Sequence, residues 1–372
     1  MTELTLVTGA AGYLGRRIAA QLLASTDDRL LLTVRVANRA GLAAAEASLR
    51  RELGIAHDNR IAVVPADLCH PDPLRSVDPK PITRVVHVAA RTEFTVSRAV
   101  ARQVNVDGTR KVADFAARCQ GLRRLLVLST LFSVGRRTGE VTERTYGDAA
   151  GFANHYEWSK HEAERLLLAE YGDLPLSIAR LATVVADDDT GAVTQYNAFH
   201  NTLKLFFYGL LSLLPGDPAT PLYLADAEFT ARGAVHLADQ DTPGGIYHLA
   251  PAPAETITLD TLVGDAFDVF DTDPGFRRRR LLRPQFCDID SFRDLVTATK
   301  GLSASPMADA LNSVAPFAAQ MFLPKRFDNR RLAAVWPSQP EIRPRALAAA
   351  ACAELVRTRW GRTPTVRMEE TA

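Results

Sequence analysis

Short apolar runs alternate with longer segments rich in Ala, Leu, Arg and Glu over the first half of the chain. Continuous apolar runs are typical of strands buried on both faces, and the segments between them have the spacing of amphipathic helices. This alternation, which continues to about residue 190, predicts βαβ units and a parallel sheet covered by helices on both faces. The predicted strands are Leu4–Val7, Leu30–Val36, Ile61–Pro65, Arg84–Val88, Leu125–Leu128 and Leu176–Ala179.

The pattern changes after Gly191. Residues 198–214 are rich in Phe and Leu, the sequence PGDP follows at 215–218, and one further strand is predicted at Ile246–Leu249. We therefore expect a doubly wound α/β domain over residues 1–190 and a smaller, mostly helical substrate-binding subdomain over residues 191–372. This subdomain is expected to pack on the carboxyl edge of the sheet, with some of its chain returning to the first domain. Residues after Pro364 are expected to form a frayed terminus.

Composition and charge narrow the classes of partner. The chain has 44 basic and 43 acidic side chains and a formal net charge of +1, so no overall field favours nucleic acid or an anionic membrane. The four cysteines lack C-x-x-C spacing and are expected to be free thiols, and no metal site is predicted. No segment reaches about 18 consecutive apolar residues, and the glycine-rich turn at residue 8 leaves no room for a signal peptide before it. We expect a cytoplasmic protein without a membrane span.

A glycine-rich turn gives the strongest functional signal. It reads TGAAGYLG over residues 8–15, directly after the first predicted strand and before a segment, Arg16–Ala24, with helical spacing of apolar positions. Glycines let backbone N–H groups approach a pyrophosphate, and the positive end of the helix dipole favours that anion. The alternative is a purely structural corner. The residues that we expect to bind a dinucleotide here are Thr8, Gly9, Gly12, Tyr13, Leu14 and Gly15.

The end of the second predicted strand indicates which dinucleotide is bound. A site for NAD is expected to place an acidic residue there, about twenty residues after the glycine-rich turn. Arg35 stands at this position instead, and no Asp or Glu occurs from Arg29 to Ala45. Because arginine suits a phosphate group, we expect NADPH, with Arg35 and Arg39 near its 2′-phosphate. The alternative is that these arginines belong to a solvated strand end.

Three further side chains are candidates for catalysis. Tyr156 and Lys160 are four residues apart and would share one face of a helix. A phenol has an ordinary pKa of about 10, and a cation nearby lowers it, so Lys160 would make Tyr156 a usable proton donor or acceptor. Thr130 follows a predicted strand at the edge where open α/β sheets bind ligands, and its hydroxyl can bond a substrate oxygen. The alternatives are an exposed Tyr–Lys pair on a helix surface and ordinary strand-end caps at Ser129 and Thr130.

Taken together, these motifs resemble the extended short-chain dehydrogenase/reductases. The residues that occur in that family's order and separation are Gly9, Gly12, Gly15, Thr130, Tyr156 and Lys160. Other segments resemble one branch, the thioester reductases, which are related to fatty acyl-CoA reductases and to the terminal reductase domains of carboxylic acid reductases and peptide synthetases. These segments are Val34-Arg35, Ala66–Leu68, His70–Asp72, His87–Ala90 with Phe94, Asn105–Thr109, Ser129-Thr130 and Val134-Gly135. The resemblance covers about residues 4 to 250.

The resemblance implies a Rossmann-like fold and an NADPH-dependent oxidoreductase. It implies that Thr130, five residues before Gly135, takes the position of the catalytic hydroxyl, that Tyr156 donates to the substrate carbonyl, and that Lys160 holds the nicotinamide ribose. Two positions depart from the family pattern, since Leu181 follows Arg180 in place of a proline and Glu228 replaces an aspartate. The remaining cofactor contacts that the resemblance implies are Asp67 and Leu68 beside the adenine, Ala89, Ala90 and Arg91 along the cofactor, and Asn105 in a supporting polar network.

The substrate implied by this branch is an acyl thioester on CoA or on an acyl or peptidyl carrier protein supplied in trans. Hydride transfer would give an aldehyde, and a second transfer would give an alcohol. The aromatic and leucine-rich segment Phe199–Leu214, with Phe206, Phe207 and Tyr208, would line an acyl pocket or belong to the core. Arg277–Arg280 together with Arg283 would bind a phosphopantetheine phosphate or the acidic face of a carrier protein, or face solvent. The alternatives are an NADPH-dependent ketone or aldehyde reductase of a hydrophobic secondary metabolite, a sugar-nucleotide epimerase or dehydratase that holds NAD, and a non-catalytic NADP-binding protein.

Overall fold

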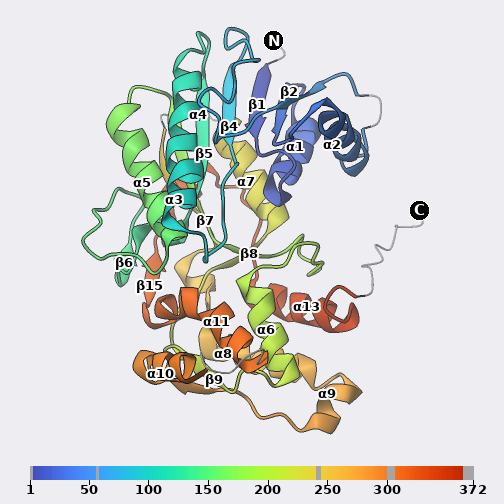
Figure 1. Cartoon of the computed structure of the whole chain (residues 1–372), viewed down its shortest axis with the longest axis vertical. Helices are drawn as coiled ribbons and strands as arrows, with labels where there is room; N and C mark the ends of the chain where they lie inside the picture. Colours follow the sequence, from blue (N-terminus) through green and yellow to red (C-terminus); the bar gives the residue numbers. More distant parts are fainter. Residues whose placement is uncertain (1–2, 56–57, 240–243, 300–305, 363–372) are drawn as a thin grey trace.

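Seven parallel strands form the central sheet, in the order β12-β7-β5-β4-β1-β2-β3 (Figure 1). The structure is a computed structural model that describes residues 3–55, 58–239, 244–299 and 306–362. Each predicted strand is present, although β2 ends at Val34 and β5 continues to Thr130. The predicted Rossmann-like, doubly wound α/β fold is therefore confirmed. The strands are β1 (Leu4–Thr8), β2 (Arg29–Val34), β3 (Ile61–Pro65), β4 (Arg84–His87), β5 (Arg124–Thr130), β7 (Leu176–Leu181) and β12 (Gly245–Leu249).

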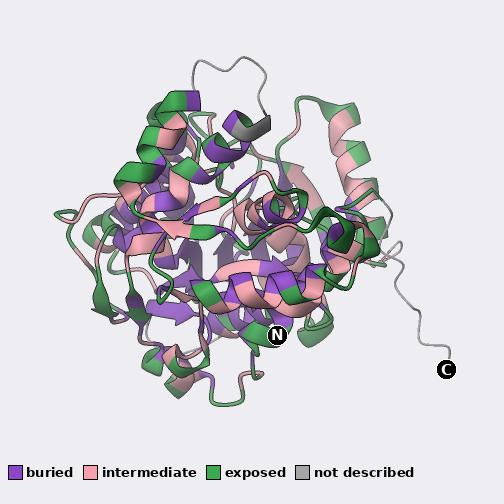
Figure 2. Cartoon of the chain, turned by 90° about the horizontal axis from the view of Figure 1, so that it is seen from below, coloured by how far each residue is buried: buried purple, intermediate pink, exposed green. Residues whose placement is uncertain are grey.

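Alternate side chains along each central strand pack on opposite faces of the sheet. In β1, Leu6 joins a cluster that includes α4 (Gly108–Ala117) and α5 (His155–Glu170). Its neighbour Val7 joins a second cluster, which includes α1 (Tyr13–Ser25) and α7 (Ala227–Asp239). Because both faces are covered, these strands are continuous apolar runs in the sequence. Figure 2 shows buried strands at the centre and exposed residues on the outer sides of the helices.

The order of the strands reverses at β1, which lies between β4 and β2. Open parallel sheets bind ligands at such a point, in the crevice beyond the carboxyl ends of the strands. The glycine-rich turn follows β1, the loop that begins at Val88 follows β4, and Thr130 ends β5. The topology therefore brings the sequence-predicted candidates to one edge of the sheet.

A mostly helical region lies beyond the carboxyl edge of the sheet (Figure 1). Four two-stranded pairs connect its parts or tie it to the first half of the chain: β8 with β11, β9 with β14, β10 with β13 and β6 with β15. Its helices are α6 (Ala198–Tyr208), α8 (Leu259–Phe270), α9 (Pro274–Arg279), α10 (Ile289–Thr299), α11 (Pro306–Ala318) and α13 (Pro344–Arg357). The short strands are β6 (Gly139–Val141), β8 (Thr183–Ala186), β9 (Leu213–Pro215), β10 (Pro221–Leu222), β11 (Leu224–Asp226), β13 (Ile257–Thr258), β14 (Gln285–Cys287) and β15 (Lys325–Phe327).

Parts of the second half of the chain return to the sheet. Helix α7 packs against α1, β12 forms the outer strand beside β7, and α12 (Arg330–Val335) packs on β12. The remaining helices are α2 (Arg39–Glu52), α3 (Arg98–Ala101) and a π-helical turn at Arg102–Asp107, together with short 3₁₀ turns. The predicted frayed segment after Pro364 lies outside the described residues.

Three further observations concern the described residues. None of their helices is long and apolar enough to cross a membrane. They contain no cluster of three or more His, Cys, Asp or Glu side chains that could hold a metal ion. All four cysteines are unpaired thiols, as predicted.

Candidate cofactor and catalytic site

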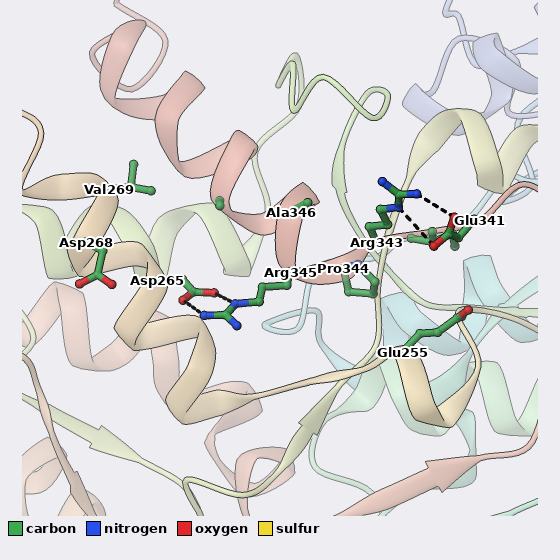
Figure 3. Close-up of a pocket in the computed structure, with 11 residues that line it drawn as sticks. Glu255, Asp265, Asp268, Val269, Glu341, Arg343, Pro344, Arg345 and Ala346 are labelled. Carbon is green, nitrogen blue, oxygen red and sulfur yellow. Dashed lines mark hydrogen bonds and ion pairs between the residues drawn. The ribbon is translucent and has the colours of Figure 1, made fainter.

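An open hollow lies between α8 and α13. Its volume is about 630 Å³, and its rim carries two arginine–carboxylate pairs, Arg345 with Asp265 and Arg343 with Glu341 (Figure 3). None of its lining residues comes from the glycine-rich turn, from β5 or from α5. The chemistry-bearing candidates therefore lie elsewhere, at the carboxyl edge of the sheet.

The turn after β1 is packed too closely for side chains. Gly9 has a φ of 70°, and a Cβ atom there would lie 2.7 Å from the Cα atom of Ala89. A Cβ atom on Gly15 would overlap the carbonyl oxygen of Gly9. Helix α1 begins directly after Gly12, and its first turn has neither a side-chain cap nor an acidic residue. The N–H groups and the positive dipole end of α1 thus fit a pyrophosphate.

Gly15→Ala is expected to abolish binding of the dinucleotide, because its methyl group would displace the backbone of the turn that would bind the pyrophosphate. Calorimetric titration with NADPH measures the loss, and circular dichroism checks that the chain still folds. Gly147→Ala is the matched control, since nothing lies within 4 Å of a Cβ atom at that exposed glycine. Unchanged affinity in the Gly15 variant would contradict the placement of the cofactor.

Two exposed arginines follow β2. Arg35 and Arg39 lie on either side of Asn38, whose side chain caps α2 by accepting a hydrogen bond from the N–H of Gly41 at 2.8 Å. Within the described ranges, neither arginine forms an ion pair with a carboxylate. Both guanidinium groups are therefore free to bind an anion beyond the end of β2, where the adenosine end of a dinucleotide is expected.

Asp67 and Leu68 follow β3, the strand next to β2. The Asp67 carboxylate accepts a hydrogen bond from the N–H of Cys69 at 2.9 Å. Leu68 is buried against Gly108, where an added Cβ atom would lie 3.0 Å from the Leu68 Cβ atom. Both residues thus follow the strand that pairs with β2 at the same edge of the sheet, and their contacts with the adenine stay a prediction.

A buried chain of hydrogen bonds supports the glycine-rich turn. Thr8 Oγ1 lies 2.7 Å from Nδ1 of His87, and Nε2 of His87 lies 3.0 Å from Thr109 Oγ1. Thr109 donates its hydroxyl proton to the carbonyl oxygen of Asn105 at 2.6 Å, so it must accept a proton from His87 Nε2. Nδ1 of His87 then accepts from Thr8. These contacts define the neutral tautomer of His87, and burial lowers its pKa to about 3.

Asn105 connects the loop after β4 with the candidate catalytic helix. It lies in the π-helical turn, a form of helix that often occurs at functional sites. Its side chain accepts from the N–H of Arg91 at 2.8 Å, and donates to the Arg91 carbonyl and to Ser159 Oγ, both at 2.9 Å. Ser159 in turn donates to the carbonyl oxygen of Tyr156 at 2.8 Å. The network fixes residues 89–91 relative to α5, and their contacts with the cofactor stay a prediction.

Tyr156 lies in the first turn of α5, which Asn154 caps by accepting from the N–H of Glu157 at 3.0 Å. The residue is 9% exposed, so the interpretation of Tyr156 and Lys160 as a surface pair is wrong. Burial raises the pKa of the phenol above its ordinary value, and a hydrogen bond with Thr130 acts in the opposite direction. Thr130 also accepts from the N–H of Phe132 at 3.3 Å. The structure thus brings Thr130 and Tyr156 together.

Lys160 does not lower the pKa of Tyr156 in this structure, contrary to our expectation. Its ammonium group donates to the carbonyl oxygen of Leu128 in β5 at 2.7 Å. Burial lowers the pKa of Lys160 to about 8, and Lys160 is not among the groups that shift the pKa of Tyr156. The phenol is therefore governed by burial and keeps its proton at neutral pH.

Arg180 and Glu164 form a buried ion pair next to these residues, and Ser129 is hydrogen-bonded to it. The Ser129 hydroxyl donates to Glu164, and Glu164 pairs with Arg180 at 2.6 Å. Arg180 lies within β7, which continues past the predicted strand end at Ala179 to Leu181. Glu164 was not a predicted site residue, although its position one helical turn after Lys160 placed it on the same face of α5.

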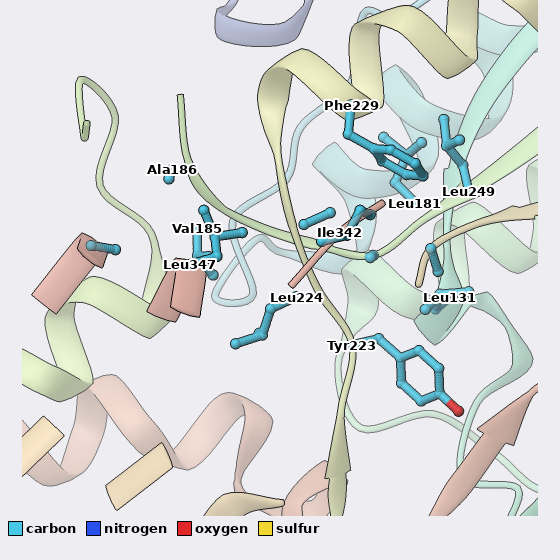
Figure 4. Packing of buried hydrophobic residues seen from close by; sticks show 14 of the residues in the cluster. Leu131, Leu181, Val185, Ala186, Tyr223, Leu224, Phe229, Leu249, Ile342 and Leu347 are labelled. Carbon is cyan, nitrogen blue, oxygen red and sulfur yellow. The ribbon is translucent and has the colours of Figure 1, made fainter. Parts of the chain in front are cut away.

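The aromatic segment of α6 belongs to the core except for Tyr208, which is exposed. Phe206 and Phe207 are buried, and Phe207 packs against Phe270 and Phe276. Leu131, Leu181 and Tyr223 belong to the same cluster where the sheet meets the helical region (Figure 4). The arginine run Arg277–Arg280 is exposed on and directly after α9, at the end of the helical region far from α5 (Figure 1). These positions favour a core role for the aromatic segment and a solvated face for the arginines.

The fold, the glycine-rich turn and the arrangement around Tyr156 define an extended short-chain dehydrogenase/reductase type of protein. More specifically, the chain belongs to the male sterility protein family, whose model matches residues 7–233. The resemblance to the thioester reductase branch is thereby confirmed at the level of the family.

Two curated relatives illustrate the range of this family. Isonitrile lipopeptide synthase of Streptomyces coeruleorubidus is 32% identical over 212 residues, which are 54% of this chain and 14% of the synthase. Alcohol-forming fatty acyl-CoA reductase of Simmondsia chinensis is 22% identical over 349 residues, 72% of this chain and 71% of the reductase. The chain thus spans only a small part of the first of these relatives.

Solved structures share the fold over nearly the whole chain. The terminal R domain from the myxalamid PKS-NRPS pathway superposes with a TM-score of 0.76 at 20% identity, covering 98% of this chain and 93% of that domain. A thiolation-reductase di-domain from an archaeal non-ribosomal peptide synthetase gives a TM-score of 0.72 at 17% identity and covers 97% and 76%. At these identities the likeness establishes the fold alone.

Proposed function

We propose that this chain is an NADPH-dependent reductase that transfers a hydride to the carbonyl carbon of an acyl thioester. The observation that carries the proposal is the buried Tyr156 hydroxyl next to Thr130, at the sheet edge where the glycine-rich turn also ends. Membership of a family that includes an alcohol-forming fatty acyl-CoA reductase supports this choice of reaction.

The residues of the chain would act on the carbonyl oxygen. Tyr156 is protonated at neutral pH because burial raises its pKa, so it can donate a hydrogen bond and then its proton to the oxygen as negative charge develops. Thr130 would share this oxygen, and Lys160 would hold the nicotinamide ribose. When bound, NADPH supplies the hydride. The thiohemiacetal formed from the thioester collapses to an aldehyde and a free thiol, and a second reduction gives the alcohol.

The thiol of the substrate would belong to CoA or to the pantetheine arm of a carrier protein. A reductase adjoins a thiolation domain in one solved structure of this fold, which supports the second possibility. Steady-state oxidation of NADPH with acyl-CoA and acyl-pantetheine thioesters, compared with the matching aldehydes and ketones, tests the proposal. Turnover of thioesters is expected. Turnover of ketones without thioester activity would overturn it in favour of a ketone reductase.

Arg35→Ser is expected to raise the KM for NADPH by about ten- to a hundredfold and to leave the KM for NADH nearly unchanged. The reason is the loss of a charge-assisted hydrogen bond to the 2′-phosphate, which is worth about 1.5–3 kcal/mol. Arg29→Ser is the matched control, because Arg29 is also exposed but lies at the other end of β2. Equal effects on both cofactors would argue against a 2′-phosphate site at Arg35.

A further inference from the structure

A segment from the second half of the chain rests on the first turn of the candidate catalytic helix. It runs from the end of α11 through the 3₁₀ turn Ala319–Phe322 to β15. The Asn154 side chain donates to the carbonyl oxygen of Pro316 at 3.2 Å, and the Gln320 side chain donates to Glu157 at 2.8 Å. Lys325 donates to the side-chain oxygen of Gln320. Two contacts thus fix this segment to the start of α5, and Lys325 holds the Gln320 side chain in place.

Glu157 is the centre of this anchor. It is 0% exposed, and its carboxylate also accepts from the N–H of Ala153 at 3.0 Å and from the Asn154 side chain at 3.1 Å. Burial raises its pKa to about 7. A carboxylate without solvent depends on all of its hydrogen-bond donors, so the loss of Gln320 from this position would be unfavourable. The anchor therefore opposes movement of the segment away from Tyr156.

The anchored segment places the Phe317 ring against Phe94, which itself packs against the candidate catalytic phenol. The ring centroid of Phe94 lies 5.9 Å from that of Tyr156 and 5.7 Å from that of Phe317 in α11. Phe94 and Phe317 are each partly exposed, whereas Tyr156 is buried. Two partly exposed rings, one from each half of the chain, thus lie in a row that leads to Tyr156.

We propose that Phe94 and Phe317 form the apolar wall against which the acyl group lies next to its carbonyl, and that Phe317 limits the bulk of the acyl groups that reach Tyr156. This inference rests on the proposed function. A carbonyl oxygen that accepts from the Tyr156 hydroxyl would lie about 3 Å from it. Because Phe94 packs against Tyr156 and Phe317 packs against Phe94, we expect bulk next to the carbonyl to meet Phe94 first and Phe317 next. Aromatic rings accept apolar groups well, so an uncharged acyl group is preferred at this position.

The test compares substrates that differ only next to the carbonyl. Straight-chain, α-branched and benzoyl thioesters of pantetheine are assayed by NADPH oxidation with the parent chain, Phe317→Ala and Phe317→Trp. In Phe317→Ala the ratio of kcat/KM for bulky over straight-chain substrates is expected to rise at least about tenfold, the scale on which apolar pockets discriminate. In Phe317→Trp the ratio is expected to fall. The affinity for NADPH is expected to stay the same in both variants.

Phe322→Ala serves as the matched control, because Phe322 is partly exposed on the same segment and makes no ring contact with Phe94 or Tyr156 in the described part of the chain. Its substrate ratio is expected to match that of the parent chain. Ratios that do not change in either Phe317 variant, or that change equally in the Phe322 variant, would overturn the inference.

Free aldehydes with the same acyl groups separate this inference from the proposed function. If the parent chain reduces aldehydes but no thioesters, the proposed function is overturned. The ratio of kcat/KM for bulky over straight-chain aldehydes still tests whether Phe317 limits the bulk of the acyl group. If it reduces thioesters and the Phe317 variants keep the substrate ratio of the parent chain, only the proposed role of Phe317 is overturned. If it reduces neither class of carbonyl compound, both proposals are overturned.

Discussion

Replacing Tyr156 by Phe is expected to keep the binding of NADPH and to lower the turnover number by at least about a hundredfold, the usual contribution of a general acid. The substitution keeps the ring that packs against Phe94 and removes only the hydroxyl near Thr130. Turnover is measured by steady-state NADPH oxidation with the thioester that the parent chain reduces fastest. The dissociation constant is measured by fluorescence titration with NADPH.

Tyr171→Phe is the matched control for this experiment. Tyr171 lies directly after α5, and its hydroxyl donates to Asp114 on the outside of the fold. Loss of this hydroxyl is expected to leave turnover unchanged. If Tyr156→Phe also kept the parent rate, Tyr156 would have no part in the reaction, and a non-catalytic NADP-binding protein would become the better interpretation.

Replacing Arg180 by Met is expected to lower the free energy of unfolding by about 3–5 kcal/mol, because Glu164 would remain buried without its cation. Arg180 is 1% exposed and Glu164 is 4% exposed. Burial alone would raise the pKa of Glu164, but Arg180 and its hydrogen bonds hold that pKa below the ordinary value. Urea unfolding followed by circular dichroism measures the loss.

The direction in which the pKa of Glu164 is shifted determines how the loss of unfolding free energy depends on pH. A carboxyl group with a lowered pKa in the folded chain contributes stability above its unfolded pKa, and this contribution disappears as the pH falls through the folded pKa. Because the unfolded chain has the same ordinary Glu164 pKa in both proteins, the difference between the parent chain and Arg180→Met depends on the two folded states. It is expected to shrink as the pH falls through the raised pKa that burial gives Glu164 in the variant, and to be smallest below the lowered pKa of Glu164 in the parent chain. A difference that stays constant down to acid pH would contradict the assignment.

Two further variants separate the buried pair from surface charge. Arg165→Met removes an exposed partner of Glu162 on α5 and is expected to change the free energy of unfolding by less than about 1 kcal/mol. Arg180→Met combined with Glu164→Leu is expected to recover much of the stability, since no unpaired charge remains. If the Arg165 variant lost as much unfolding free energy as the Arg180 variant, burial of the Arg180–Glu164 pair would not explain the loss.

The sheet could be predicted from the sequence because most of its strands are buried on both faces and form mainly apolar runs, although β7 also contains Ser177 and Arg180. The strand β12 was also predicted, although it follows a long helical region. The glycine-rich turn could be recognised because a close backbone approach leaves no room for a Cβ atom at Gly9 or Gly15. Each of these features depends on local spacing, which is visible in a single chain.

Features that depend on contacts between distant segments could not be predicted. Glu157 and Gln320 are separated by 163 positions, and nothing in either local pattern indicates that they meet. The hydrogen bond from Lys160 to Leu128 was missed for a related reason, since helical spacing places a side chain on a face but does not determine its partner. The same limit applies to Arg180, whose carboxylate partner lies on α5.

Strand β12 has a consequence for synthesis of the chain. It pairs with five of the six residues of β7, from Gly245 beside Ser177 to Leu249 beside Leu181. While the ribosome is still translating the residues between them, the outer edge of β7 has unpaired N–H and C=O groups, which form a template for other strands. The edge of β7 can therefore be covered by its own chain only after residue 249 has left the ribosome, and until then this edge is a site at which the nascent chain could associate wrongly.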